Sequence, residues 1–326
     1  MVTPVSKASA RQRAGRAGRV EPGKCFRLYT ERAFSDLQDT QPPEIRRCHL
    51  ASVVLQLKAM GISNVANFEF MDAPPRAAIL RALEQLYALG ALDDSGELSE
   101  PLGRQMAVLP LEPMAAKMVL RSDAHGCTRE AIALAAMMSV DAIFVSRRAQ
   151  HQQAAAARRR LGAAHGDHLT LLNVYRAFSE VPKGSASAWC RDRFVSRRAL
   201  LKAQSVAAQL VGYCAQAGVD ADASCGSNLE ALRRCLVEGF FLHAARATPD
   251  GAYKCLANGQ VVAVHPSSVL AAQQASQRPS CVIYSELVRT TKVWMRDVTA
   301  IEARWLAELA PRYYATAPAT VDTASR

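Results

Sequence analysis

Residues 74–110 read PPRAAILRALEQLYALGALDDSGELSEPLGRQMAVLP, and this stretch decides which kind of fold the chain can adopt. After the two prolines, apolar residues recur at the i, i+3, i+4 spacing of a helix through Ile79, Leu83, Leu86 and Tyr87. The DDSG segment that follows predicts a turn with short strands beside it. A helix followed by a hairpin is typical of the second half of a winged-helix module.

The first half of that module lies just upstream, in QPPEIRRCHLASVVLQLKAMGI at residues 41–62. Its apolar residues share one helical face, and they are Leu50, Val53, Val54, Leu57 and Met60. The helix starts after Pro-Pro, and Gly61 ends it. We therefore expect a winged helix at residues 40–109.

Upstream of the winged helix, the chain offers too little sequence for a domain. KCFRLYT at residues 24–30 alternates apolar and polar side chains as one strand does, between Gly23 and Thr30. One strand without a partner is not stable. We expect residues 1–39 to be the last piece of a sheet encoded elsewhere, or else to be disordered.

Downstream, the period stays helical and then changes. Residues 110–226 carry successive helical segments, which predict a helical bundle. After the polar segment DADASCGSN, short apolar runs are separated by Gly, Asn, Pro and Ser, which predicts strands. Residues 227–326 are therefore expected to form a small β-barrel with a C-terminal helix.

The overall composition restricts the partners that the protein can have. Forty Lys and Arg against 29 Asp and Glu give a formal charge of +11 and a pI near 9.4, which suits a polyanion. An acidic protein partner or a merely solvated basic surface are the alternatives. The nine Cys include no CxxC pair, which favours free reduced thiols over a metal site. Without an apolar stretch of about 18 residues or a secretory signal, we expect a soluble intracellular protein and no membrane partner.

QRAGRAGR, residues 12–19, is the sharpest motif in the chain. Small residues let the backbone turn tightly while closely spaced arginines fan outward, an arrangement suited to an anion. Arg16 and Arg19 could stabilise charge on a transferring γ-phosphoryl group, and Gln12 could position a water. The alternative is a flexible Gly- and Arg-rich segment that binds RNA loosely.

The longer segment SKASARQRAGRAGRVEPGKCFRLYT, residues 6–30, closely resembles motif VI and the following strand of DEAH-box RNA helicases. Later segments, including FEFMDAPP, GDHLTLLNVYRAF and YSELVRTTKVWMRDVTAIEARWLAELAP, are similar to C-terminal signatures of that family in the same order. The resemblance implies a multi-domain, mainly α protein with a C-terminal β-barrel. Its parts would be a remnant of the second RecA-like domain, a winged helix, a helical ratchet and an OB-fold.

The same resemblance implies a nucleotide site. In this family, Gln12, Arg16 and Arg19 would contact ATP phosphates across a cleft between two RecA-like domains, with both arginines acting as arginine fingers. The 326 residues contain neither a P-loop lysine pattern nor an Asp-Glu-Ala-His motif. We expect ATP and its Mg²⁺ to be held mostly by a part of the protein absent from this chain, and the lone chain to be inactive as an ATPase.

Candidate RNA contacts come from three polar segments. They are Thr290, Thr291 and Lys292 in RTTKVWMR, His265 and Ser267 in HPSS, and Arg147 with Arg148 after an apolar helix end. Such residues often only cap turns, which is the alternative for each. Asp167, in the loop-to-helix junction that contains His165 and His168 and begins DHLTLLNVYRAF, is expected to be a helix N-cap rather than a catalytic group.

The resemblance therefore implies part of an ATP-dependent 3'-to-5' RNA helicase that acts on pre-mRNA splicing or another ribonucleoprotein, in the nucleus or, as the less favoured alternative, in the cytoplasm. Its partners would be single-stranded RNA, the spliceosome or another ribonucleoprotein, and a helicase-activating G-patch protein. One alternative is a non-catalytic module that binds RNA or a G-patch partner. A weaker alternative is a DNA-binding protein, because winged helices often enter the major groove.

Overall fold

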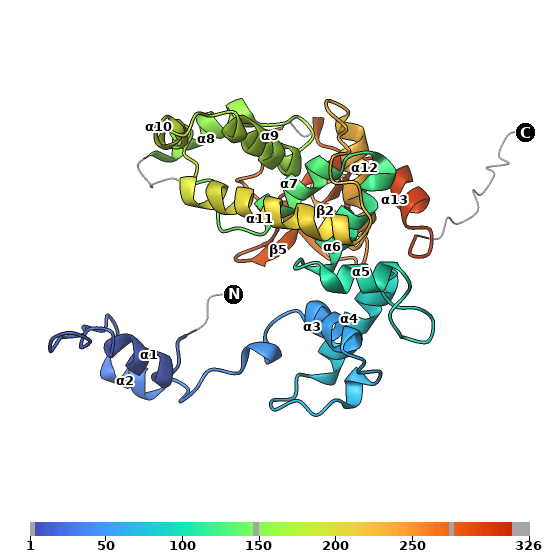
Figure 1. The fold of residues 1–326 in the computed structure, drawn as a ribbon. Coiled ribbons are helices and arrows are strands. Elements are labelled where there is room, and N and C mark those ends of the chain that lie inside the picture. The colour runs from blue at the N-terminus through green and yellow to red at the C-terminus, as the bar shows by residue number, and fades with distance from the viewer. Residues whose placement is uncertain (1–3, 146–149, 274–276, 315–326) are drawn as a thin grey trace, which may run out of the picture.

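The computed structural model describes residues 4–145, 150–273 and 277–314, which form a small N-terminal lobe, a winged helix, a helical body and one sheet. Figure 1 shows the N-terminal lobe set apart from the other parts and joined to them by an extended segment. None of the described helices is long and apolar enough to cross a membrane.

The N-terminal lobe contains α1 (Lys7–Ala14) and α2 (Glu31–Ser35). Ser6 caps α1, since its Oγ accepts a hydrogen bond from the Ser9 amide at 3.1 Å. The predicted strand at residues 24–30 is wrong, because these residues pair with nothing, and Phe26 and Leu28 are 84% and 99% exposed. Without a neighbouring strand the backbone has no ladder to join, so the apolar residues stay in solvent.

The winged helix consists of α3 (Ala51–Ala59), α4 (Arg76–Ala88) and α5 (Leu102–Val108). Gly61 ends α3 in a left-handed conformation with φ of 88°, as predicted. The expected short strands are reduced to a single bridge between Leu92 and Leu98. The chain then turns into α5 because the Ser99 Oγ accepts from the Gly103 amide at 3.0 Å, which stabilises a helical start.

The predicted helical bundle is confirmed. Its helices are α6 (Pro113–Arg121), α7 (Thr128–Met138), α8 (His151–Leu161), α9 (Asp167–Ser179), α10 (Ala186–Asp192) and α11 (Arg197–Gln216). A further helix, α12 (Leu229–Phe240), packs against α6. The approach is so close that a Cβ on Gly239 would lie 2.6 Å from the Met114 carbonyl oxygen, so only glycine fits there.

Seven strands follow α12, and they are β1 (Ala244–Ala247), β2 (Tyr253–Cys255), β3 (Val261–Val264), β4 (Cys281–Ile283), β5 (Glu286–Arg289), β6 (Val293–Arg296) and β7 (Thr299–Ile301). Their order is β5-β6-β3-β2-β1-β4-β7, and every neighbouring pair is antiparallel except β3 with β6. The predicted barrel is wrong for the described residues, which form an open sheet with β5 and β7 at its edges, and β7 pairs on its outer side only through a bridge from Thr299 to Gly166. The strands are only three or four residues long, which leaves few backbone groups with which to close the sheet.

The two faces of the sheet bury different cores. On β1, Ala244 faces the large apolar core of the helical body, while Ala245 faces a second, smaller core. β4 alternates in the same way, because neighbouring residues of a strand point to opposite faces. The last helix, α13 (Ala303–Leu309), buries Trp305 in the large core and packs against α12. One face of the sheet is thereby fixed on the helices.

Candidate functional site

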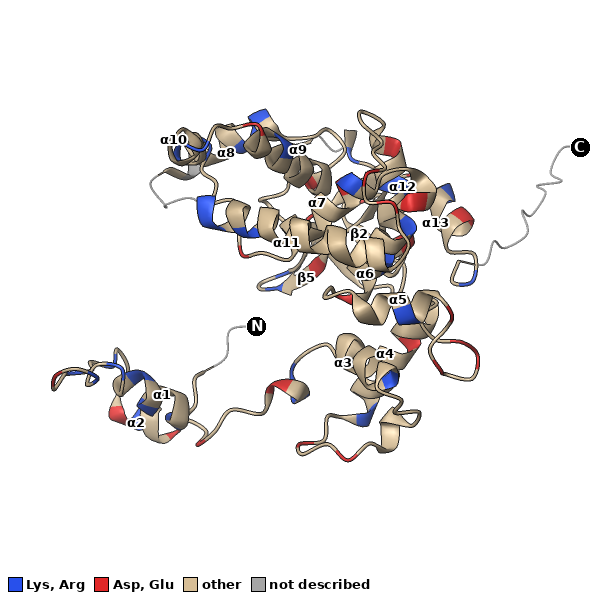
Figure 2. Ribbon diagram, in the orientation of Figure 1, with Lys and Arg blue, Asp and Glu red and all other residues tan. Residues whose placement is uncertain are grey.

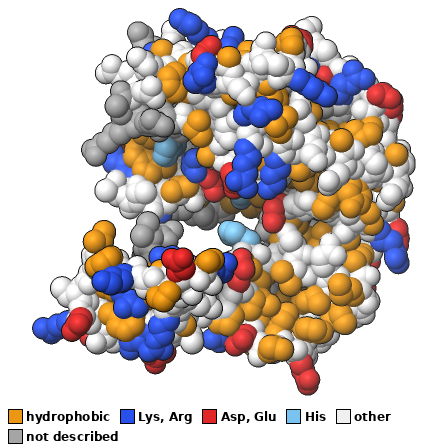
Figure 3. Space-filling view, turned by 60° about the vertical axis from the view of Figure 1, so that its left-hand side comes forward, with side chains coloured by type: hydrophobic (Ala, Val, Ile, Leu, Met, Phe, Trp, Pro, Cys, Tyr) orange, Lys and Arg blue, Asp and Glu red, His pale blue; other side chains and the backbone are white. Residues whose placement is uncertain are grey.

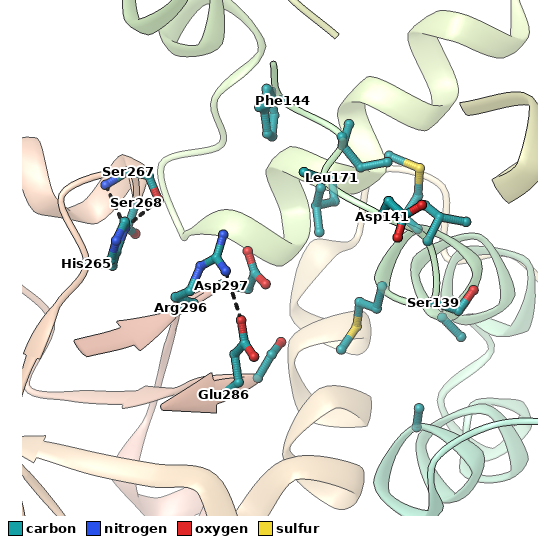
Figure 4. A pocket seen from close by; sticks show the side chains of 18 of the residues that line it. Ser139, Asp141, Phe144, Leu171, His265, Ser267, Ser268, Glu286, Arg296 and Asp297 are labelled. Carbon is teal, nitrogen blue, oxygen red and sulfur yellow. Dashed lines mark hydrogen bonds and ion pairs between the residues drawn. The ribbon is translucent and has the colours of Figure 1, made fainter. Parts of the chain in front are cut away.

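A cavity of about 1130 Å³ lies where the winged helix, the helical body and the sheet meet. Its walls come from α3, from α6 and α7, from the 139–145 segment and α8, and from the 265–269 loop with the ends of β5 and β6. Figure 4 shows side chains from the sheet on one side of this cavity and side chains from the helices on the other. Figure 3 shows that the molecule is also hollowed on the face turned to the viewer, with Lys and Arg on both sides of the hollow.

The sheet side of the cavity combines charges of both signs. Arg296 at the end of β6 pairs with Glu286 on β5, at 3.1 Å between Nη1 and Oε1. Asp297 follows with a φ of 50°, a left-handed conformation that is rare outside glycine and directs the chain back towards the bundle. Burial raises the pKa of Asp297, and the guanidinium groups of Arg296 and Arg158 partly oppose that rise.

His265 and Ser267 line the same side from the loop between β3 and η6 (Val269–Ala272). Their side chains are hydrogen-bonded, at 2.7 Å between Nδ1 and Oγ. Burial lowers the pKa of His265, and the nearby Arg296 and Arg158 lower it further. The ring is therefore neutral near pH 7 and can serve as a hydrogen-bonding group.

The helical side presents guanidinium groups beside an aromatic ring. Arg158 of α8 lies over the Phe144 ring, with its Cζ 4.1 Å from the ring centroid. Its Nη2 donates to the Asp167 carboxylate at 3.3 Å, while its buried Nε has no hydrogen-bond partner among the described residues. Arg159 lines the cavity as well, and it is exposed. Two arginines of one helix therefore border the cavity beside Phe144.

Asp167 joins the bundle to the sheet. It is 1% exposed, and its two carboxylate oxygens each accept a backbone amide at 2.9 Å, one from Val269 and one from Val298. The predicted N-cap role is wrong, because Asp167 is the first residue of α9 and Gly166 occupies the cap position. Gly166 is required there, since a Cβ would lie 2.3 Å from the Val298 carbonyl oxygen.

His168 completes this joint beside the cavity. Its Nδ1 and Nε2 are hydrogen-bonded to Thr299 Oγ1 at 2.8 Å and to Ser285 Oγ at 2.9 Å. Complete burial lowers the pKa of His168 to about 4, so the ring stays neutral in the folded protein at neutral pH. With both nitrogens occupied, this histidine has a structural role and no free group for acid–base chemistry.

This arrangement suits binding more than bond making. Permanently charged guanidinium groups bind phosphate, hydroxyl groups bind sugar and phosphate oxygens, and aromatic faces stack with bases. The hydroxyl groups and rings of this cavity are those of Ser52, Ser139, Ser267, Ser268, Ser285, Phe144, Phe194 and Phe240. No group of three or more His, Cys, Asp or Glu that could hold a metal occurs in the part of the chain that the structure describes. The lining therefore offers positively charged and hydrogen-bonding groups that suit a polar, anionic ligand.

The structure brings only some of the predicted RNA-contact residues together. His265 and Ser267 line the cavity. Thr290, Thr291 and Lys292 form the exposed turn between β5 and β6 and are not among the lining residues. Thr290 serves that turn, because its Oγ1 accepts from Trp294 Nε1 at 3.1 Å. Arg147 and Arg148 lie outside the described residues.

The motif residues near the N-terminus lie in the N-terminal lobe, outside the cavity lining. Gln12 is on α1, and Arg16 and Arg19 are in the turn and bend after it. All three side chains are exposed. They form a separate, solvent-facing group of polar and basic side chains.

Sequence reasoning missed most of the cavity lining, including Phe144, Arg158, Arg159, Glu286, Arg296 and Asp297. A signal exists for two of them, since AAAARRR at residues 154–160 is an unusually basic end for a helix. Asp297 gave no signal, because a left-handed aspartate cannot be distinguished by sequence from an aspartate in an ordinary turn. The lining comes from many segments that are far apart in the sequence, and only tertiary packing brings them together.

Comparison with known families agrees with this order of parts. Three family models match: a helicase-associated winged-helix domain at residues 82–111, a ratchet-like helicase-associated domain at residues 112–171, and an oligonucleotide/oligosaccharide-binding fold at residues 232–313. Together the matches cover most of the cavity lining, except for α3 and Phe194.

Three curated proteins are similar along almost the whole chain. The probable ATP-dependent RNA helicases DHX35 of Pongo abelii and Homo sapiens are 47% and 46% identical over 314 residues, or 96% of this chain. The pre-mRNA-splicing factor ATP-dependent RNA helicase DEAH10 of Arabidopsis thaliana is 42% identical over 328 residues, or 97% of this chain. The chain spans 43–45% of the length of these relatives.

Proposed function

The chain belongs, through its winged-helix, ratchet-like and OB-fold domains, to the DEAH-box RNA helicases, and from this we propose that its central cavity binds single-stranded RNA during ATP-dependent remodelling. The observation that carries the proposal is the composition of the cavity. Arginine guanidinium groups, serine hydroxyls and the partly buried rings of Phe144 and Phe194 line it, and three domains contribute to one continuous lining.

Two adjacent arginines allow a sharp test of this proposal. Arg159 lines the cavity, whereas Arg160 is the next residue of α8, is also exposed, and does not line it. We expect Arg159→Ala to weaken binding of the 326-residue chain to a single-stranded oligouridylate roughly tenfold, because a charge-assisted hydrogen bond contributes about 1.5–3 kcal/mol. Fluorescence anisotropy in low salt measures this affinity.

Arg160→Ala is the matched control, since it removes the same charge from the same helix. It should change the affinity much less than Arg159→Ala. Equal losses in both variants would mean that the helix attracts RNA only by its general charge. The cavity proposal would then be wrong.

We further propose that residues 1–39 are the end of a RecA-like domain and that Gln12, Arg16 and Arg19 contact the phosphates of ATP. Their exposure leaves the side chains free to reach a nucleotide, and two arginines fit the charge of a triphosphate. Bound ATP supplies the phosphoryl group that is hydrolysed, and this chain's arginines would neutralise negative charge as it develops. We assign none of this chain's residues to Mg²⁺, because the described part has no suitable acidic cluster.

The biological setting is proposed from the relatives. One relative is named a pre-mRNA-splicing factor, which supports a nuclear role in splicing with the spliceosome as the assembly acted on. A G-patch activator is a further proposed partner. Exposed apolar side chains on the winged helix, such as Met60 and Met71, favour a protein contact there.

A further inference from the structure

A second basic surface lies outside the cavity, on α10 and the start of α11. Residues 183–202 contain six Lys and Arg against one Asp, and they supply nearly half of the chain's net charge of +11. We call this surface the elbow patch, and its basic residues are Lys183, Arg191, Arg193, Arg197, Arg198 and Lys202. Figure 2 shows Lys and Arg along α10 and at the start of α11.

The charge of the elbow patch is largely uncompensated. Among the ion pairs of the described residues, the only one within the patch joins Arg191 to its neighbour Asp192, at 3.9 Å. Arg197, Arg198 and Lys202 are exposed and have no acidic partner in the part of the chain that the structure describes. Like charges held together on one surface repel each other, so a bound anion would relieve an unfavourable arrangement.

Some of these charges are also held in place. The Arg193 guanidinium lies over the Trp189 ring at 4.6 Å, and Trp189 packs against Phe178 with their centroids 5.7 Å apart. Arg193 and Arg197 both lie close enough to the Cys190 thiol to lower its pKa against the effect of burial. The basic groups of α10 and α11 therefore meet around Cys190.

The elbow patch is attached directly to the cavity wall. Phe194, between α10 and α11, lines the cavity and has a φ of 55°, a strained value for a residue with a side chain. Two backbone hydrogen bonds of 2.8 Å, from Val145 to Phe194 and from Ser196 to Ile143, bind this elbow to the lining segment. Arg197 is three residues beyond Phe194, so their Cα atoms are at most about 11 Å apart.

We propose that the elbow patch binds the phosphates of a strand of RNA that continues beyond the cavity. The partner is RNA because the patch adjoins the cavity wall through Phe194, and because Arg197, Arg198 and Lys202 have no acidic partner among the described residues. The inference rests on the proposed function of the cavity. It adds a second contact, in which the elbow patch binds a further segment of the RNA strand that occupies the cavity.

The test compares two lengths of oligouridylate on the full 326-residue chain. A short strand of about 5 nucleotides is sized for the cavity and a long one of about 15 reaches beyond it, within the range that an OB-fold protein covers. The variant R197E/R198E reverses two charges at the first turn of α11, where acidic residues are tolerated by the helix dipole. The control R76E/R81E reverses two exposed charges on α4, one of them also at the first helical residue.

We expect wild type and R76E/R81E to bind the long strand more tightly than the short one. R197E/R198E should lose roughly tenfold or more of its affinity for the long strand and keep its affinity for the short one. The slope of log affinity against log salt for the long strand should fall by about 1.4, since each phosphate contact contributes about 0.7 on single strands.

Three results would overturn the proposal. Unchanged binding of the long strand by R197E/R198E would show that the patch is not used. An equal loss on both strands would show a general effect of charge, and tighter binding of an oligoglutamate than of RNA by wild type would show an acidic protein site. Failure of the short strand to bind wild type would contradict the cavity function instead, and the comparison on the long strand would still report on the patch.

Discussion

At the scale of single residues, the joint between bundle and sheet depends on Asp167 and His168. Both side chains are buried. The two ring nitrogens of His168 are hydrogen-bonded to the hydroxyl groups of Thr299 and Ser285. Burial disfavours the protonated ring more than the nearby Asp167 carboxylate favours it, which is why its pKa lies at about 4. The unfolded chain has an ordinary histidine that binds a proton more readily.

This difference makes stability depend on pH. Because the folded pKa is lowered from 6.5 to about 4, the stabilisation is complete above pH 6.5 and is lost as pH falls towards 4. Between pH 7.5 and pH 5 the free energy of unfolding should fall by about 2 kcal/mol from this group alone. Urea unfolding at both pH values measures the change.

His168→Gln keeps a neutral hydrogen-bonding side chain and removes the titration. We expect it to be less stable than wild type at pH 7.5 and to lose less stability on acidification. The half-buried His243 also has a lowered pKa, and it remains in both proteins. A variant with the same pH dependence as wild type would show that His168 does not contribute.

At the scale of elements, the contact of α12 with α6 has no room for a larger residue at Gly239. A Cβ there would lie 2.6 Å from the Met114 carbonyl oxygen and 2.7 Å from the Met118 Cβ. Neither atom belongs to a flexible side-chain end. The two helices would have to move apart, although Cys235 also donates to the Met118 carbonyl at 3.1 Å and holds them together.

We therefore expect Gly239→Ala to lower the free energy of unfolding by about 1–3 kcal/mol through overpacking. Gly212→Ala on α11 is the control, because nothing lies within 4 Å of its added Cβ. There alanine should stabilise the helix by up to about 1 kcal/mol. Thermal unfolding should show a lower stability for Gly239→Ala and a higher stability for Gly212→Ala than for wild type. A change of stability in the same direction for both variants would contradict the packing argument.

At the scale of the whole molecule, the basic motif of residues 12–19 and the cavity occupy different parts of the structure. The 326 residues carry no P-loop lysine pattern and no Asp-Glu-Ala-His motif. A motif that only neutralises phosphate charge cannot bind and orient ATP by itself. RNA binding and nucleotide chemistry should therefore be separable.

We expect the purified 326-residue chain to bind RNA but to show no RNA-stimulated ATP hydrolysis in a phosphate-release assay. In a helicase that also carries the nucleotide-binding motifs, Arg16→Ala or Arg19→Ala should reduce turnover by about 10³-fold and leave RNA affinity unchanged. Arg13→Ala is the matched control and should have a smaller effect. Hydrolysis by the chain alone, or normal turnover of Arg16→Ala, would contradict the assignment.

The fold could be predicted where periodicity is local and could not where pairing is distant. The helical period of residues 110–220 predicted the bundle, since each helix buries one face. The extended conformation of residues 24–30 was expected to be a strand, but a strand depends on a neighbour that the local sequence does not contain. The prediction of a barrel was wrong for the same reason, because the sequence of neither β5 nor β7 shows whether the two strands pair.

The candidate site was predicted only in part. His265 and Ser267 were found because HPSS is a polar loop between apolar runs. Thr290 and Lys292 have the same polar character, yet they form a solvent-facing turn outside the lining. Composition can identify a polar loop, but the direction in which the loop faces is set by packing between domains.

The buried carboxylate of Asp167 has a mechanical meaning for the cavity. It accepts hydrogen bonds from the backbone amides of Val269 and Val298, and it therefore fixes the sheet side of the cavity to the first turn of α9. If the cavity opened while these hydrogen bonds were kept, the movement would have to occur on the side of the cavity that α3 lines. On that side, α3 is joined to the start of α6 by a solvent-exposed hydrogen bond in which Ser52 donates to Glu112 at 2.7 Å.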